Sequence, residues 1–247
     1  MCGIVGYIGD KEKKEVILSG LKELEYRGYD SAGMAVMSDG KIDFFKAVGK
    51  LENLALKTKD FTSTGFGVAI GHTRWATHGK PTEINAHPHL GEHSFVVHNG
   101  IIENYKELKD ELEAKGVKFM SQTDTEVIVH LFEEILKEKK DPFKAYEATI
   151  AKLRGAYATL LITKTAPDKI FFAKDAAPMA IGKSDKKELY FASSDAPLIG
   201  NATEVAYLDD NNYGYVSLDE IAVFKHGKKA SITFNALPKD KSYAQKE

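Results

Sequence analysis

Cys2 is the single cysteine of this chain and the residue best suited to nucleophilic chemistry. It follows Met1 directly, and a small side chain at this place allows the initiator methionine to be removed. The mature chain would then begin with a thiol and a free α-amine on one residue. A thiol has a pKa of about 8.5 and an α-amine one of about 7.7–8.0, so the amine is a suitable base for activating the thiol. Taken alone, Cys2 also fits a small buried residue that begins a strand.

Four further segments contain more Arg, His, Asn, Asp and Gly than a folded core requires. They are LEYRGYDSAG (24–33), GHTRWATHG (71–79), HNGIIENY (98–105) and SQTDTEV (121–127). Each lies near the end of an expected strand or in a loop, where scaffolds commonly present binding groups. Taken singly, each also fits an ordinary polar segment: Asn99-Gly100 is a typical turn dipeptide, and Asp124 suits the first turn of a helix.

The elements that position these segments can be predicted from apolar spacing. A strand is expected at 2–8, then a helix through Ile17, Leu21 and Leu24 that ends near Gly28, then a hairpin around Asp39-Gly40. Further strands are expected at 66–70 and 94–98, helices at 105–112, 127–135 and 142–153, and short strands at 156–164, 169–174, 179–182, 188–194, 204–208, 222–227 and 230–234. Because hairpins dominate the second half and no regular βαβ alternation continues, an α+β fold with large antiparallel sheets is predicted.

Composition excludes several classes of protein. The 247 residues are 43% hydrophobic and 28% charged with a formal net charge of -2, which describes a globular chain without a cationic field for nucleic acid or anionic lipid. No apolar run approaches the roughly 20 residues that span a bilayer, and the first residues do not resemble a signal peptide. We therefore expect a cytoplasmic protein with neither a nucleic-acid partner nor a membrane partner.

Metal and cofactor sites are not expected either. One cysteine cannot form an internal disulfide or a thiolate zinc site. Six of the eight histidines fall in one stretch, at His72, His78, His87, His89, His93 and His98. No HExxH pattern accompanies them, so most are expected to be hydrogen-bonded loop or core groups.

Taken together, MCGIVGYIG, LEYRGYDSAG, HTRWATHG, NAHPH, HNGIIEN and TDTEV resemble the glutaminase domain of the glutamine–fructose-6-phosphate aminotransferase family. An N-terminal CGI resembles class II glutamine amidotransferases in general, whereas YRGYDSAG and HTRWATHG resemble this branch. The resemblance implies an N-terminal-nucleophile hydrolase fold, a four-layer αββα sandwich with two largely antiparallel sheets. It also implies that residues 1–238 form the glutaminase domain and that 239–247 begin a linker to a sugar-phosphate isomerase domain absent from this chain.

The resemblance further assigns roles to single residues. Cys2 would attack the side-chain amide of L-glutamine, and the Asn99 side chain with the Gly100 backbone N–H would stabilise the oxyanion. Arg74 would bind the α-carboxylate of glutamine and Asp124 its α-ammonium group. The remaining carried-over residues are Trp75, which would cover the occupied site, Thr77 and His78 on the same loop, His87 bordering that loop, and Arg27, Tyr29 and Asp30 as a supporting early loop.

The function implied by the resemblance is that of a glutamine amidotransferase. Glutamine would be hydrolysed to glutamate and ammonia through a γ-glutamyl thioester on Cys2. The ammonia would serve to convert fructose 6-phosphate into glucosamine 6-phosphate in hexosamine biosynthesis, and the full-length enzyme would be a homodimer. Two alternatives stay open: the same chemistry for another acceptor, as in purine-pathway amidophosphoribosyltransferase or asparagine synthetase, and a non-catalytic regulatory domain that retains the fold.

Overall fold

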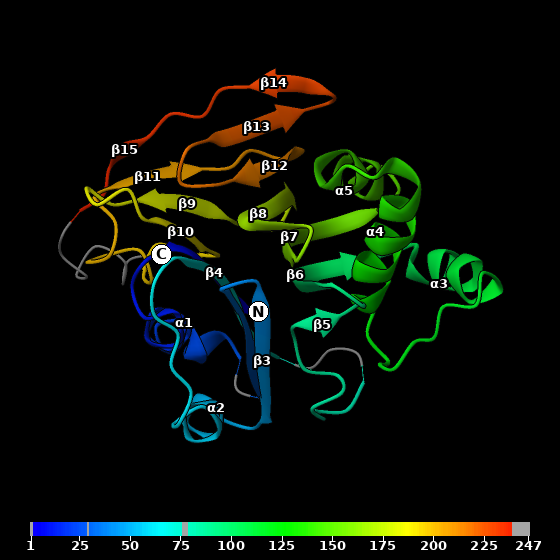
Figure 1. Ribbon diagram of the computed structural model, residues 1–247, viewed down its shortest axis with the longest axis horizontal. Coiled ribbons are helices and arrows are strands. Elements are labelled where there is room, and N and C mark those ends of the chain that lie inside the picture. Colours follow the sequence, from blue (N-terminus) through cyan, green and yellow to red (C-terminus); the bar gives the residue numbers. More distant parts are fainter. Residues whose placement is uncertain (1, 29, 76–78, 239–247) are drawn as a thin grey trace.

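The computed structural model describes residues 2–28, 30–75 and 79–238, except for the side chain of residue 27, and they form two antiparallel sheets packed face to face (Figure 1). The first sheet has the order β15-β11-β9-β10-β1-β4-β2-β3. Its strands are β1 (Gly3–Gly9), β2 (Ser31–Ser38), β3 (Lys41–Val48), β4 (Gly67–Arg74), β9 (Ala180–Lys183), β10 (Leu189–Ala192), β11 (Glu204–Tyr207) and β15 (Asn235–Ala236). β1 therefore lies in the middle of this sheet, and every one of its residues is buried.

The second sheet has the order β14-β13-β12-β8-β7-β6-β5. Its strands are β5 (His89–Leu90), β6 (Ser94–Ile102), β7 (Gly155–Thr163), β8 (Ala166–Asp175), β12 (Asn212–Val216), β13 (Ile221–Lys225) and β14 (Lys228–Ala230). β6 pairs along its whole length with β7, so the polar segment at its end is held by a regular ladder.

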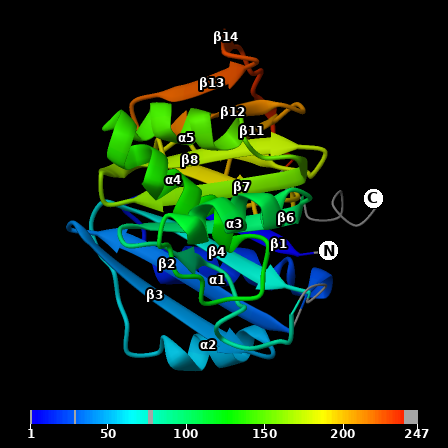
Figure 2. The ribbon, with the colours of Figure 1, turned by 90° about the vertical axis from the view of Figure 1, so that its right-hand side faces the viewer.

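Helices cover the outer face of each sheet. The helical segments α1 (Lys13–Lys22), η1 (Glu25–Arg27) and α2 (Leu51–Lys57) lie on the side of the first sheet, and α3 (Tyr105–Ala114), α4 (Glu126–Lys139) and α5 (Pro142–Ile150) lie on the side of the second, as Figure 2 shows from the α3–α5 side. α5 begins where sequence chemistry favours it, because Asp141 accepts from the Lys144 N–H and proline occupies the first helical position. Among the described helices, none has the length and apolar character needed to cross a membrane.

Three apolar layers separate these four structural layers. One lies between the sheets and joins Ile4 of β1 to Leu160 of β7. Another packs Tyr7 of β1 against Ile17 of α1, and the third packs Phe132 of α4 onto the second sheet. Burial of strand residues on both faces explains why β1 carries apolar residues at successive positions. The predicted αββα sandwich of antiparallel sheets is confirmed.

Most predicted elements are present, with shifts at their ends. The hairpin at Asp39-Gly40 is confirmed, and both residues have positive φ (51° and 72°), as the favoured two-residue turn requires. Strand 94–98 extends further, to Ile102, and the last predicted helix ends at Ile150.

Two segments near the end of the chain differ from what the sequence predicts. The expected strand at 230–234 is wrong beyond Ala230, because Ile232 and Phe234 pack against the inter-sheet core as irregular chain. β12 was not predicted, since NNYGYV contains typical turn residues. At Gly214 a Cβ would lie 1.8 Å from the Ala222 carbonyl oxygen, so glycine there serves close strand pairing instead of a turn.

Candidate active site

Cys2 lies directly before β1, beside the end of β4. In the register of these strands Gly3 pairs with Thr73, which brings Cys2 opposite Arg74. The Trp75 backbone N–H donates to Cys2 Sγ over 3.2 Å. Burial raises the pKa of the Cys2 thiol, while the hydrogen bond from Trp75 and the positive charge of Arg74 act in the opposite direction. With its pKa raised, the thiol needs a nearby base before it can attack.

Asn99 approaches Cys2 from the second sheet. Its side-chain Nδ2 donates to the Cys2 carbonyl oxygen over 3.0 Å, while its Oδ1 lies 3.0 Å from His72 Nε2. His72 Nε2 is also 3.1 Å from the His98 carbonyl oxygen. Because both partners of Nε2 are acceptors, this nitrogen carries the hydrogen, and burial lowers the pKa of His72 to about 3, so the ring is neutral. His72 thereby holds the Asn99 amide with its NH₂ group toward Cys2.

The Asn99-Gly100 dipeptide is not a turn. β6 runs straight through it, with Asn99 opposite Ala158 and Gly100 opposite Tyr157. Gly100 has φ +119°, and a Cβ at this position would lie 1.9 Å from the Ala156 carbonyl oxygen. Only glycine can hold this backbone so close to β7. The result is an unobstructed stretch of main chain directly beside the Asn99 amide.

One buried cation and two carboxylates accompany the thiol. Arg74 is the last residue of β4 and only 4% exposed. Burial lowers the pKa of its guanidinium, and the carboxylates of Asp30 and Asp124 oppose that shift. Asp124 is fixed by the Ile102 N–H, which donates to Oδ2 over 2.7 Å at the end of β6.

Asp30 is held by main-chain contacts with the same region. Its N–H donates to the Arg74 carbonyl oxygen over 3.0 Å, and its own carbonyl accepts from Gly49. Gly28 packs equally closely, because a Cβ there would lie 2.8 Å from the Arg74 carbonyl carbon. The early loop therefore forms a wall next to the end of β4.

His87 lies behind the site, not at its surface. It is 5% exposed, its ring centroid is 4.0 Å from that of His72, and its Nε2 is 2.9 Å from Thr125 Oγ1. His98 Nδ1 shares the same hydroxyl, also at 2.9 Å. Burial lowers the pKa of His87 and His98, so these rings are neutral packing and hydrogen-bonding groups. Within the part of the chain that the structure describes, no cluster of three or more His, Cys, Asp or Glu residues is arranged to hold a metal ion.

The main chain of Trp75 contacts the Cys2 thiol, and 46% of the Trp75 surface is exposed. The predicted residues Tyr29, Thr77 and His78 lie outside the described residues, as does the side chain of Arg27. The structure thus brings together Cys2, Arg74, Asn99, Gly100 and Asp124, although they are far apart in the sequence. His72 and Thr125 were not singled out from the sequence; the only signal for His72 is its place in HTRWATHG.

Comparison with known proteins shows the family of this chain. A family model described as a glutamine amidotransferase domain matches residues 72–200. Glutamine–fructose-6-phosphate aminotransferase [isomerizing] of Campylobacter jejuni is 64% identical over all 247 residues, and the proteins of the same name from Helicobacter pylori and Escherichia coli are 55% identical over 219 residues and 42% over 225. The chain spans 41%, 36% and 37% of the length of these relatives and is itself covered to 100%, 89% and 91%.

Solved structures share the fold. Glutamine phosphoribosylpyrophosphate amidotransferase from B. subtilis, in complex with ADP and GMP, superposes with a TM-score of 0.67 at 25% identity, over 88% of this chain and 49% of that one. An allosteric regulatory enzyme of purine biosynthesis superposes with a TM-score of 0.68 at 26% identity, over the same shares of the two chains. These likenesses confirm the predicted N-terminal-nucleophile hydrolase fold. The chain belongs to the glutamine amidotransferase domain family.

Proposed function

We propose that this chain hydrolyses the side-chain amide of L-glutamine, with Cys2 as the nucleophile. The observation that carries the proposal is the contact between Cys2 and Asn99 across the two sheets, in which the amide NH₂ group of Asn99 reaches the Cys2 main chain over 3.0 Å. A donor in this position, held by a neutral His72, is ready to meet negative charge that develops on a carbonyl attacked by the thiol.

The reaction follows in two halves. After removal of Met1, the Cys2 α-amine takes the thiol proton, and the thiolate attacks the δ-carbonyl carbon of glutamine. The resulting oxyanion accepts hydrogen bonds from Asn99 Nδ2 and the Gly100 N–H. When the carbon–nitrogen bond breaks, the α-ammonium group returns its proton to the departing nitrogen, which leaves as ammonia. Water, deprotonated by the same amine, then hydrolyses the γ-glutamyl thioester and releases glutamate.

Substrate recognition rests on the charges around the thiol. The Arg74 guanidinium is suited to the planar α-carboxylate of glutamine, and the Asp124 carboxylate to its α-ammonium group. Trp75 with Thr77 and His78 would cover the bound amino acid, and Arg27, Tyr29 and Asp30 would support the opposite wall. His87 would act through His72 and Thr125, without contact to glutamine.

The acceptor that we propose for the ammonia is fructose 6-phosphate. The support is that the 64% identical relative carries the name glutamine–fructose-6-phosphate aminotransferase [isomerizing], whereas the solved enzyme of purine biosynthesis is 26% identical. Residues 1–238 would then be the glutaminase domain, and 239–247 would lead toward an isomerase domain in a cytoplasmic, dimeric enzyme of hexosamine synthesis.

The experiment is a glutaminase assay on the isolated chain, with and without fructose 6-phosphate. We expect release of glutamate and ammonia, no glucosamine 6-phosphate, and no stimulation by the sugar, because the sugar-binding contacts would lie in the isomerase domain. A processed chain that releases no glutamate would contradict the glutaminase proposal. Stimulation by the sugar would contradict the domain assignment alone.

A further inference from the structure

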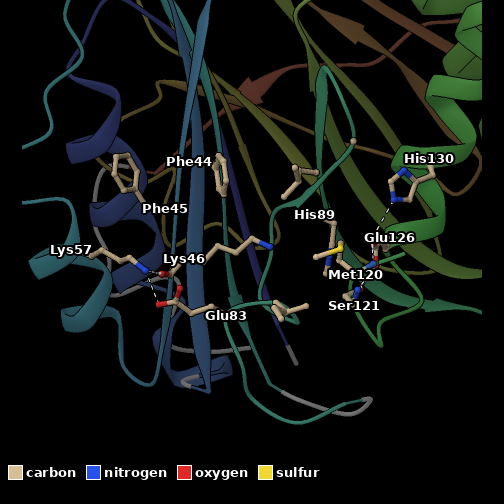
Figure 3. Close-up of a pocket in the computed structure, with 13 residues that line it drawn as sticks. Phe44, Phe45, Lys46, Lys57, Glu83, His89, Met120, Ser121, Glu126 and His130 are labelled. Carbon is tan, nitrogen blue, oxygen red and sulfur yellow. Dashed lines mark hydrogen bonds and ion pairs between the residues drawn. The ribbon is translucent and has the colours of Figure 1, made fainter. Parts of the chain in front are cut away.

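A cavity lies between the edge strands of the two sheets. β3 is the outermost strand of the first sheet and β5 of the second, and a pocket of about 470 Å³ opens between them and the start of α4 (Figure 3). This volume falls within the range of small-molecule sites, roughly 300–1,000 Å³. None of the residues that line it is among those proposed to handle glutamine.

Lys46 is the charged group that points into this pocket. In β3 side chains alternate between the two faces, so Phe44 and Lys46 share the face toward the second sheet, where the Phe44 ring lies 5.2 Å from that of Phe95. Lys46 is only 8% exposed, and Figure 3 shows its amine extending toward His89 and Met120. Across the described residues, no hydrogen bond or ion pair engages Lys46 Nζ. Most of the Lys46 side chain is buried, and its amine meets the open pocket without a protein partner. The charge of this amine is therefore left to solvent or to a ligand, so the pocket favours an anion.

The other charged groups of the pocket already have partners. Glu126 accepts from the Met120 N–H over 2.8 Å, from both N–H and Oγ of Ser121 over 2.6 Å, and from His130 Nε2 over 3.2 Å. Lys57 pairs with Glu83 over 2.6 Å. Neither carboxylate comes within 4.0 Å of Lys46 Nζ in the described structure. Lys46 is therefore the cation of this pocket that is left for a ligand.

The rest of the lining is largely apolar. Phe44, Ile84, Leu90 and Met120 contribute exposed hydrophobic surface around the opening. Apolar side chains gathered at a cavity with one polar anchor are typical of sites for small organic ligands. An inorganic anion would leave these side chains in water, whereas an anion with an apolar body would cover them.

We propose that this pocket binds a small organic monocarboxylate, with the carboxylate paired to Lys46 Nζ and the apolar body packed against Phe44, Leu90 and Met120. The site is distinct from the glutamine site and does not depend on the function proposed above. Binding requires a protonated amine. Burial lowers the pKa of Lys46 to about 8, against the opposing effect of Glu126 and Glu83; Lys57, His89 and His130 are the other titratable groups around the pocket.

The test uses naphthoate as the probe and calorimetric titration of the full chain. Its neutral amide is the matched probe, Lys46→Met removes the amine at nearly constant volume, and Lys41→Met removes an exposed charge from the same strand as control. We expect saturable binding of naphthoate at one site, weakened at least about tenfold by Lys46→Met and unchanged by Lys41→Met. The amide should bind wild type and Lys46→Met equally.

The pH dependence gives a second, independent measurement. Since the free amine loses its proton as pH rises through about 8, naphthoate affinity should be constant below that pH and fall above it in wild type and Lys41→Met. Lys46→Met should show no such fall. Absence of saturable binding, equal binding of acid and amide to wild type, or an unchanged affinity in a folded Lys46→Met protein would each overturn the proposal.

Discussion

His72 Nε2 lies 3.0 Å from Asn99 Oδ1, so a strand of the first sheet determines which way an amide of the second sheet faces. The hydrogen bond matters because an asparagine amide can otherwise rotate and present its oxygen to the same place. With the oxygen held by His72, the NH₂ group is available to Cys2 and to the oxyanion beside it.

Replacement of His72 by Leu should release this amide. We expect kcat for glutamine hydrolysis to fall about tenfold or more with little change in KM, since the lost orientation affects the developing charge and not the amino-acid groups of the substrate. His72→Gln retains a donor and should recover most of the rate. His93→Leu, a change at an exposed histidine, serves as control. Equal rates for the Gln and Leu variants would contradict the positioning role.

Asn99→Ala removes the donor itself. By analogy with other oxyanion donors, kcat should fall by about 10²–10³, with a smaller effect on KM. Steady-state kinetics with glutamine measure both, and thermal unfolding shows whether the sandwich persists. A variant with near-normal kcat would exclude Asn99 from the oxyanion site.

Retention of Met1, or an N-terminal tag, should abolish turnover without unfolding the protein. The Cys2 nitrogen would then be an amide with no basic lone pair, and the half-buried thiol, whose pKa is raised, would have no base of its own. Intact-mass analysis paired with the glutaminase assay measures this, and Cys2→Ala is the inactive reference. Similar activity in processed and unprocessed chains would rule out the amine as base.

Arg74→Lys keeps the positive charge but loses the planar fork. The KM for glutamine should rise about tenfold, while the rate at which a small neutral reagent alkylates Cys2 should stay nearly normal. The two measurements separate substrate binding from thiol reactivity. An unchanged KM would remove Arg74 from the carboxylate site.

The charge of Glu126 should make the free energy of unfolding depend on pH in the acidic range. Burial raises the pKa of its carboxyl, but the hydrogen bonds from His130, Met120 and Ser121 outweigh it and hold the pKa well below the ordinary value of 4.5. Because this pKa is lower in the folded than in the unfolded protein, the charged carboxylate stabilises the fold at pH values above the pKa of the unfolded chain. That stability is lost as pH falls from about 5 toward the pKa of the folded protein. Glu126→Gln should therefore lower the free energy of unfolding at neutral pH by about 1–3 kcal/mol and flatten its slope below pH 5.

Denaturant unfolding at several pH values measures this slope. Glu111→Gln, at an exposed position of α3, is the matched control and should change neither quantity. An unaltered slope in Glu126→Gln would mean that the buried network does not depend on the carboxylate charge.

The layers of this fold could be predicted because local patterns and tertiary structure agree for most elements. The hairpin at Asp39-Gly40 and the helix through Leu108 and Leu112 have the expected turn chemistry and apolar spacing. β12 could not be predicted, since a glycine such as Gly214 usually indicates a turn. Its role in close strand pairing becomes visible only with the neighbouring strand in place. Propensity is a weak guide where a second strand must approach so closely.

The candidate site, too, could be predicted from the sequence only in part. Cys2, Arg74, Asn99, Gly100 and Asp124 could be named from motif resemblance. The function of His72 could not be predicted. It depends on the His98 carbonyl oxygen and the Asn99 amide oxygen, and only the structure shows that these two acceptors lie beside its ring. The burial of Lys46 could not be predicted either, since an isolated lysine in a strand ordinarily reaches solvent.

The proposed reaction centre belongs to neither sheet alone: thiol and cation come from the first, and the amide donor comes from the second. The distances between the reacting groups therefore depend on how accurately the two sheets pack against each other. A truncation in the inter-sheet layer, such as Leu160→Ala, would shift the thiol relative to the amide donor. The rate of glutamine hydrolysis would therefore fall at temperatures where the protein is still folded. For this architecture, selection for turnover is at the same time selection for an accurately filled interior.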